Sequence, residues 1–170
     1  MKKTSSTFVV QIAGAEHLKF AEDLCKLYED SAKKRGTGIA KRDPEYIKEK
    51  ILQEKGIIAI TADNHIAGFC YIETWEGKNY VANSGLIVKE EFRHHGLAKK
   101  IKKFVFEHTR KKFPQAKIFG ITTSLAVMKL NSDLGYKPVT FSELTQDDAF
   151  WSGCKSCINY DVLTRTGRKN

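Results

Sequence analysis

Apolar residues recur at spacings of three and four along two long stretches of the chain, which is the period of an amphipathic helix. In residues 16–36 these positions are Leu18, Ala21, Leu24, Cys25 and Tyr28. In residues 96–113 they are Leu97, Ala98, Ile101, Phe104, Val105 and His108. The pattern predicts a helix over each stretch, and a shorter one over residues 124–135.

Residues that start and stop helices stand at the ends of these stretches. Gly36 follows a basic last turn and provides a left-handed stop for the first helix. Asp43 as N-cap and Pro44 at the first helical position open another helix, which we expect to end at Gly56. Pro114 ends the long helix that precedes it.

Short runs rich in β-branched and aromatic residues, bounded by turn residues, predict the strands. They are residues 7–13, 57–61, 66–75, 80–88, 116–122 and 136–141. The resulting order, β-α-α-β-β-β-α-β-α-β, indicates one mixed α/β domain over residues 1–170. Gly85 interrupts the fourth run, as a bulge or a close approach of a ligand would require.

The tail of the chain departs from this regular alternation. From about residue 141 we treat it as an atypical C-terminal extension of the domain. The expected sheet has six strands, or seven if "CINYDVL" (residues 157–163) closes it. A truncated chain, or a partner that completes the sheet, is the alternative.

Charge and composition narrow the class of partner. The formal net charge of +9 favours anionic partners, such as nucleic acid, acidic lipid, a phosphorylated cofactor or a carboxylate. Most aromatic residues fall at core-like spacings, so we expect no nucleic-acid partner. No stretch approaches the ~18 apolar residues of a membrane span, and we expect no membrane partner. The apolar run at residues 8–10 is too short for a signal peptide, so the expected location is the cytoplasm.

The four cysteines do not suggest a disulfide framework. Cys154 and Cys157 have the C-x-x-C spacing of half a zinc site or of a redox pair, but no two further ligands stand nearby. His94 and His95 are adjacent, and two neighbouring ligands alone do not make a metal site. We therefore expect no metal.

The sequence "RHHGLA" (residues 93–98) lies between the fourth strand and the long helix. The first amides of a helix lack intrahelical acceptors, and the helix dipole adds positive potential there. Gly96 would let the backbone approach a phosphate closely. This stretch suggests a pyrophosphate site, although the spacing taken alone favours a plain helix start with a loop glycine.

R-x-x-G-x-A after a fourth strand, in this strand order, resembles the acyl-CoA-binding motif of the GNAT superfamily of N-acyltransferases. "IFGITTSLAVMKLNSDLGYKPV" (residues 118–139) is similar to the strand, helix, turn and final strand of the same superfamily. The resemblance extends from residue 7 to about residue 141. It implies the GNAT fold, with a mixed central sheet that splays between strands four and five.

The resemblance also implies an acyl-CoA co-substrate: acetyl-CoA, or another short acyl-CoA such as succinyl-CoA. The pyrophosphate would bind the backbone from Arg93 through His94, His95, Gly96 and Leu97 to Ala98. The pantetheine arm would pair with Leu86, Ile87 and Val88. Four lysines of the helix are candidates for the 3′-phosphate: Lys99, Lys100, Lys102 and Lys103. Lys99 is the first of them, and a solvated basic face is the alternative for each.

Amine acylation by a thioester needs a neutral amine, a stabilised oxyanion and a proton for the thiolate. Glu73 is the carboxylate best placed on a central strand to accept the amine proton, and a merely hydrated carboxylate is the alternative. Asn83 and Ser84 are candidates for positioning water. The superfamily's usual acid, a tyrosine four residues before the glycine of the closing turn, is replaced by Asn131, which we assign to the cofactor site. Either the thiolate leaves unaided or another residue such as Tyr136 contributes.

The connection between the first two helices is basic and glycine-containing, "KKRGTGIAKRDPEY" (residues 33–46). Arg35, Lys41 and Arg42 would suit a carboxylate-bearing substrate, unless this is only a solvated loop. The chain also looks like small stand-alone bacterial GNAT proteins linked with arginine biosynthesis, through "RGTGIAKR", "ANSGLIV" and "FWSGCKSCINYDVLTR". That likeness implies acylation of the α-amine of glutamate.

Two other functions remain open at this stage. The chain could acylate a different amine, on a protein or a small molecule, or it could be a non-catalytic CoA-binding module. In each case we expect a small-molecule partner, and we keep a homodimer as an option for the assembly.

Overall fold

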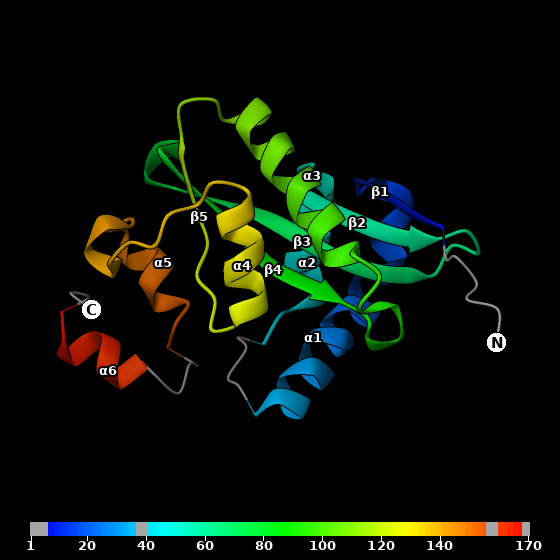
Figure 1. Ribbon diagram of the computed structural model, residues 1–170, viewed down its shortest axis with the longest axis horizontal. Helices are drawn as coiled ribbons and strands as arrows, with labels where there is room; N and C mark the ends of the chain where they lie inside the picture. The colour runs from blue at the N-terminus through cyan, green and yellow to red at the C-terminus, as the bar shows by residue number, and fades with distance from the viewer. Residues whose placement is uncertain (1–6, 37–40, 156–159, 168–170) are drawn as a thin grey trace.

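The computed structural model describes residues 7–36, 41–155 and 160–167 (Figure 1). A mixed sheet of five strands in the order β1-β2-β3-β4-β5 forms its centre. The strands are β1 (Phe8–Ile12), β2 (Gly56–Thr61), β3 (Ile66–Trp75), β4 (Tyr80–Val88) and β5 (Lys117–Phe119). β1 to β4 pair with their neighbours antiparallel, and β5 runs parallel to β4.

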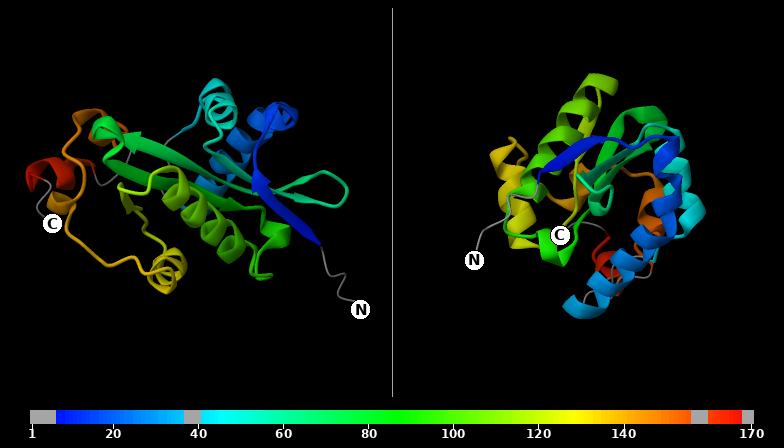
Figure 2. Two further views of the ribbon diagram at one scale, coloured as in Figure 1. Left: turned by 90° about the horizontal axis from the view of Figure 1, so that it is seen from above. Right: turned by 90° about the vertical axis from the view of Figure 1, so that its right-hand side faces the viewer.

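Helices pack on both faces of this sheet. A 3-10 helix (Ala15–Phe20) leads into α1 (Ala21–Arg35), and α2 (Pro44–Leu52) precedes β2. The long helix α3 (Leu97–Lys112) follows β4, and α4 (Leu125–Asp133) follows β5. Figure 2 shows the sheet between α3 on one side and α1 with α2 on the other.

Strand alternation divides the interior into two cores. On β2, Ile58 packs with α1 and α2, whereas Ile57 and Ala59 pack with α3. On β3, Phe69 and Tyr71 belong to the first core, while Cys70 belongs to the second. Because both faces are covered, the central strands read as continuous apolar runs rather than alternating ones.

Most of the local signals are confirmed. Gly36 caps α1 in the left-handed conformation, with φ of 60°. The carboxylate of Asp43 accepts the Glu45 amide at 2.8 Å, and Pro44 begins α2. α2 ends earlier than predicted, at Leu52, and Gly56 is instead the first residue of β2.

The predicted sixth and seventh strands are wrong for the described residues. Residues 136–140 are irregular, and a 3-10 helix (Phe141–Glu143) follows. β5 covers only Lys117–Phe119, so it offers little edge for a further strand to pair with. Pro138 also removes an amide that such a ladder would need.

The tail forms helices instead. They are α5 (Asp148–Ser152) and α6 (Tyr160–Arg165), and they lie at the end of the molecule near β5 (Figure 1). Trp151 and Leu144 form a third core with Ala82 of β4 and Phe119 of β5. Aromatic packing therefore covers the part of the sheet where an additional strand was expected.

Candidate active site at the fork between β4 and β5

β4 and β5 separate soon after they meet. They pair from Tyr80↔Lys117 to Ala82↔Phe119, and in the described part of the chain β4 continues to Val88 with no strand on that side. The result is a fork whose apex lies at Asn83. The splay predicted between the fourth and fifth strands is thus present, and it leaves backbone groups of β4 accessible to a ligand.

Gly85 marks a bulge in β4, one of the two alternatives that the sequence offered. The register passes from Phe69↔Ile87 to Tyr71↔Ser84, so that Gly85 and Leu86 stand opposite the single residue Cys70. The φ of Gly85 is 65°, and a Cβ there would lie 2.2 Å from a ring carbon of Tyr71. The bulge therefore depends on glycine both for conformation and for space.

On one face of the sheet, tyrosines hold Arg42 beside this bulge. The hydroxyl of Tyr28 donates to the Gly85 carbonyl. The Arg42 guanidinium lies 4.0 Å from the centre of the Tyr28 ring, and its Nε donates to the Tyr71 hydroxyl at 3.0 Å. Burial raises the pKa of both tyrosines, so both remain neutral donors and acceptors.

Glu73 belongs to the same face, two residues along β3 from Tyr71. Its Oε1 accepts a hydrogen bond from the hydroxyl of Tyr46 on α2. Tyr46 packs edge-to-face on Tyr71, with ring centroids 5.7 Å apart. Burial, together with the charge of Glu73, raises the pKa of Tyr46. The Glu73 carboxylate is half-buried and is oriented by Tyr46 of α2. Tyr46 packs on Tyr71, which in turn accepts a hydrogen bond from Arg42.

A different polar network lies on the opposite face, at the apex. The Oγ1 of Thr109 donates to Asn83 Oδ1 at 2.8 Å, and Asn83 Nδ2 donates to the Tyr136 hydroxyl at 3.0 Å. The Nζ of Lys102 donates to the Asn83 carbonyl at 3.3 Å. Asn83, predicted to position water, thus has its side chain bonded to α3 and to the segment after α4. Ser84 is half-buried, and its carbonyl accepts from the Cys70 thiol at 3.2 Å.

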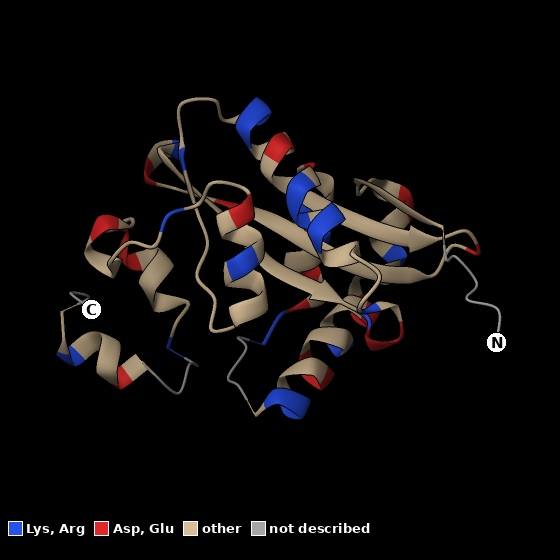
Figure 3. Cartoon of the chain, viewed as in Figure 1, with Lys and Arg blue, Asp and Glu red and all other residues tan. Residues whose placement is uncertain are grey.

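The turn before α3 has the geometry of an anion site. Gly96 is the N-cap with φ of 73°, and His94 also has a positive φ of 65°. Among the described residues, no acceptor is found for the amides from His94 to Lys99. Arg93 anchors the turn through a hydrogen bond from its Nε to the Val88 carbonyl at 3.1 Å. The two histidines and Gly96 are exposed, and lysines recur along α3 (Figure 3).

Two further predicted site residues, Asn131 of α4 and Lys99 of α3, lie in this region. Asn131 is buried, and its Oδ1 has no hydrogen-bond partner among the described residues. Lys99 lines a hollow of about 230 Å³ between α3 and α4. The other residues that line it are Lys102, Lys103, Leu130, Asp133 and Leu134.

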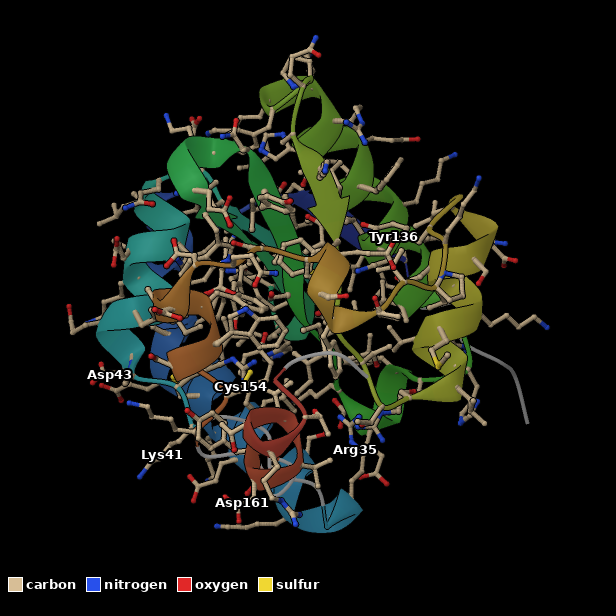
Figure 4. The ribbon with its side chains drawn as sticks, turned by 90° about the vertical axis from the view of Figure 1, so that its left-hand side faces the viewer. Arg35, Lys41, Asp43, Tyr136, Cys154 and Asp161 are labelled. Atoms are coloured by element: carbon tan, nitrogen blue, oxygen red, sulfur yellow. The ribbon has the colours of Figure 1, made fainter. Side chains whose placement is uncertain are left out.

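The three cations of the predicted acid-binding loop are not gathered in one place. Arg35 is exposed at the end of α1, where its guanidinium donates to the Ser31 hydroxyl at 2.5 Å. Lys41 is exposed and lies apart from Arg35, on the other side of α6 in Figure 4. Of the three, only Arg42 contacts residues at the bulge. Residues 37–40 between them lie outside the described part.

The cysteine pair of the tail cannot be placed as a pair. Cys154 is half-buried in the third core, and Cys157 lies outside the described residues. In the described ranges, no three His, Cys, Asp or Glu side chains gather where a metal ion could bind. Nor does that part of the chain contain a helix long and apolar enough to cross a membrane.

Sequence reasoning missed the tyrosines Tyr28, Tyr46 and Tyr71 as site residues. It treated Lys102 as one of several lysines of a basic face and missed its burial. The tyrosines carry no local signal, because only the fold brings them together. Lys102 does carry one. It lies in the series Ala98, Lys102, Val105 and Thr109, whose spacings of four, three and four define the inward side of α3.

A free strand edge that leads from a bulge to a turn with unpaired amides suits an elongated ligand with an anionic end. This arrangement, on a mixed sheet with helices on both faces, places the protein in the class of acyl-CoA-dependent transferases. The family model for acetyltransferases of the GNAT family matches residues 20–130, so the chain belongs to the GNAT acetyltransferase family. The predicted fold class is confirmed. A comparison with curated protein sequences gives no significant match.

Several solved structures share the fold at low sequence identity. N-acetylglutamate synthase from Neisseria gonorrhoeae, solved with coenzyme A and N-acetyl-glutamate, is 13% identical with a TM-score of 0.65. The alignment covers 97% of this chain but 34% of the synthase, so the chain spans about a third of that protein. A GNAT acetyltransferase from Staphylococcus aureus is 18% identical, with a TM-score of 0.67 and coverage of 82% of this chain and 90% of that one.

A third relative matches over nearly the full length of both chains. The protein Rv2747 from Mycobacterium tuberculosis, solved with CoA and a further ligand, NLQ, is 14% identical with a TM-score of 0.66. The alignment covers 95% of this chain and 93% of that protein.

Proposed function

We propose that this protein transfers an acetyl or related short acyl group from acyl-CoA to the amine of a small acidic substrate, in the first place the α-amine of glutamate. One observation carries the proposal. The free edge of β4 begins at the fork, at Asn83, and continues directly to the unpaired amides that precede α3. An extended ligand with a pyrophosphate at one end suits such a track.

The amide of Arg93 donates to the Glu90 carbonyl at 3.2 Å, so in this proposal the amides from His94 to Ala98 bind the pyrophosphate, and Lys99 binds the 3′-phosphate. The pantetheine arm adds to the free edge of β4 along Leu86 to Val88, as an additional strand would. The thioester then reaches the apex, near Ser84 and Asn131. CoA in the structures of the gonococcal synthase and of Rv2747 supports an acyl-CoA co-substrate for this fold.

The acyl transfer would take place beside the bulge. A bulge leaves a backbone amide outside the strand ladder, and the amide of Leu86 would donate to the developing oxyanion. Glu73, held by Tyr46, would accept the proton of the attacking amine, directly or through water. Both groups belong to the part of the sheet where Arg42 is held.

Arg42 supports an acidic acceptor. Its guanidinium is fixed by Tyr28 and Tyr71 at the bulge, and a planar guanidinium binds a carboxylate with two parallel hydrogen bonds. The N-acetyl-glutamate found with the gonococcal synthase agrees with this substrate class. Arg35 and Lys41 remain proposed contributors to substrate binding.

The second candidate is a non-catalytic CoA-binding module. Asn131, at the position where the superfamily usually has a tyrosine acid, favours it. An amide side chain cannot donate a proton to a thiolate.

Titration calorimetry with acetyl-CoA, followed by thiol-release assays over a panel of amino acids and other amines, separates these candidates. We expect CoA binding, and turnover on glutamate that falls in Arg42→Gln through a higher KM for the amino acid. Lys129→Gln, a change of an exposed lysine on α4, serves as the control and should leave turnover as it is. CoA binding without turnover on any amine would support the binding module, and an unchanged KM in Arg42→Gln would remove the acidic acceptor.

A further inference from the structure

A buried lysine lies at the apex of the fork. Lys102 on α3 is 2% exposed, and among the described residues its ammonium group makes one hydrogen bond, to the Asn83 carbonyl at 3.3 Å. Within the described residues it forms no ion pair. An ammonium group has three donors, and burying it without a counter-charge is costly. Such a residue is expected where a function requires it.

The position of the ammonium group is defined by the last residues of the β4–β5 pairing. Gly120 is the residue after β5, and a Cβ built on it would lie 3.7 Å from the Asn83 carbonyl and 3.8 Å from Lys102 Nζ. Lys102 Nζ therefore occupies the gap in which the next backbone pair of a continuous sheet would form. Asn131 Nδ2 is 3.7 Å from the same point, and the Oδ1 of that residue is buried without a described partner.

The titratable groups around Lys102 come from several elements. Cys70 on β3 is buried, and burial raises the pKa of its thiol to about 11 despite the opposing effect of Lys102. The ring of Tyr136 lies below the ammonium group, 5.4 Å from Nζ to its centroid. Asp133 of α4 and Lys99 and Lys103 of α3 line the adjoining hollow and are exposed.

The thiol end of CoA would arrive beside this group. If the pyrophosphate binds the turn before α3, the pantetheine arm runs back along β4 from Val88 towards Asn83. The five residue-to-residue steps from Val88 to Asn83 span about 17 Å, comparable with an extended pantetheine arm. This step depends on the proposed function, and it places the sulfur of the thioester at the apex.

We propose that Lys102 is the catalytic acid of the transfer, in place of the tyrosine that Asn131 replaces. The amine nitrogen forms a bond to the thioester carbon, and the C–S bond breaks with its electron pair on sulfur. The Lys102 ammonium group donates a proton to that sulfur and leaves CoA as the thiol. The amine proton goes to Glu73 or water, and Lys102 regains its proton from solvent through the hollow between α3 and α4.

Burial shifts the pKa values of the two candidate acids, Lys102 and Tyr136, in opposite directions. It lowers the pKa of Lys102 and raises that of Tyr136. A thiol has a pKa of about 8.5, and proton transfer is most effective when donor and acceptor are matched. The pKa of Lys102 is thus shifted towards that of the leaving thiol, whereas the pKa of Tyr136 is shifted away from it. Tyr136 also already accepts a hydrogen bond from Asn83.

The test measures the pKa of the CoA thiol when bound to the full chain. Ultraviolet absorbance of the thiolate is followed with pH, and CoA without its sulfur, desulfo-CoA, provides the baseline. A cation within about 4–6 Å lowers the pKa of an acid by about 1–3 units, so we expect a shift of this size for bound CoA. The shift should disappear in Lys102→Met and persist in Tyr136→Phe. It should also persist in Lys111→Met, which changes an exposed lysine of the same helix.

Each result decides the proposal. A bound thiol that titrates like free CoA in the unmodified chain overturns it, as does a shift that survives Lys102→Met or is lost in Tyr136→Phe. If CoA does not bind the unmodified chain, the proposed function fails together with this inference. If CoA binds without the shift, only the role of Lys102 fails. Lys102→Gln provides a second variant should Lys102→Met not fold.

Kinetics give a second, independent result. Loss of an acid should lower kcat about 10²- to 10⁴-fold in Lys102→Met and leave the KM for acyl-CoA unchanged. The limb of the kcat profile on which activity falls at high pH should also disappear. Mass spectrometry that finds Lys102 itself acylated would contradict the proposal, because a nucleophilic lysine must be neutral when the donor is bound.

Discussion

The position of Gly85 requires glycine for two separate reasons. Its left-handed φ of 65° disfavours other residues, and the adjacent Tyr71 ring leaves no room for a Cβ. Gly77 shares the first requirement only, with φ of 63° and nothing within 4 Å of its Cβ position. Comparing the same substitution at Gly85 and Gly77 therefore distinguishes the cost of backbone strain from the cost of crowding.

We predict that Gly85→Ala lowers the free energy of unfolding by about 2–5 kcal/mol, the sum of strain and overpacking. Gly77→Ala should cost about 1–2 kcal/mol, from strain alone. Urea unfolding of both variants measures the difference. Equal losses would mean that the tyrosine ring moves aside and that the bulge is not held in place by packing.

Lys102 also affects stability, with a sign that follows from its lowered pKa. The unfolded chain keeps this proton up to about pH 10.4, whereas the folded chain releases it at lower pH. Between these two values the unfolded state binds more protons, so the free energy of unfolding rises with pH in this window. The cost of the buried charge is fully present below the pKa of the folded state.

We therefore predict that Lys102→Met is more stable than the unmodified chain at neutral pH. The advantage should be about 1.4 kcal/mol for each unit by which the pKa is lowered, and it should shrink as the pH approaches about 10.4. Urea unfolding at a series of pH values, taken as the difference between the two proteins, removes the contributions of the buried tyrosines. A difference that does not change with pH would show that Lys102 titrates normally.

At the scale of elements, the turn before α3 and the free edge of β4 act together. Gly96 and Gly36 both have a left-handed φ and open space around the Cβ position, but only Gly96 belongs to the turn with unpaired amides.

We predict that Gly96→Ala weakens CoA binding about 5- to 10-fold, since about 1 kcal/mol of strain opposes the conformation that presents the amides. Gly36→Ala should lose comparable stability and keep its affinity for CoA. Titration calorimetry with CoA measures the affinity of both variants. Equal affinities would show that the turn before α3 does not bind CoA.

The elements also show where sequence patterns were sufficient. Asp43, Pro44 and Gly36 act through neighbouring backbone, so their effects on α1 and α2 were predictable from local spacing. The length of β5 was not, because a strand extends only as far as a neighbour pairs with it. Residues 120–122 belong to the predicted fifth strand, yet the fork leaves them without a partner on β4. The expected sixth strand had the same dependence and is absent among the described residues.

At the scale of the whole molecule, the tail determines how the sheet ends. Glu76 before β4 accepts the Thr145 hydroxyl at 2.5 Å and the Gln146 amide at 2.7 Å. Both tryptophans of the chain, Trp75 and Trp151, belong to or pack on the third core. Tryptophan fluorescence consequently reports on the tail, while circular dichroism reports on all helices and the sheet.

We predict that the two signals follow one urea unfolding transition with the same midpoint, because the tail shares its core with β4 and β5. Trp151→Ala should lower the free energy of unfolding by about 3–5 kcal/mol, as expected for removing a buried aromatic side chain. A separate fluorescence transition at lower urea would identify the tail as an independent unit and contradict the single domain proposed from the sequence.

The sequence by itself determined the order of the main helices and strands, the GNAT character of the chain and the turn at residues 93–98. These depend on local periodicity and on short motifs, which neighbouring residues establish. Only the tertiary structure decided which side chains meet. It brought Arg42 to Tyr28 and Tyr71 but not to Arg35, and it placed Lys102 at the fork beside Asn83 and Asn131. Such contacts join residues far apart in the chain, and the packing of helices on both faces of the sheet, rather than any local pattern, fixes them.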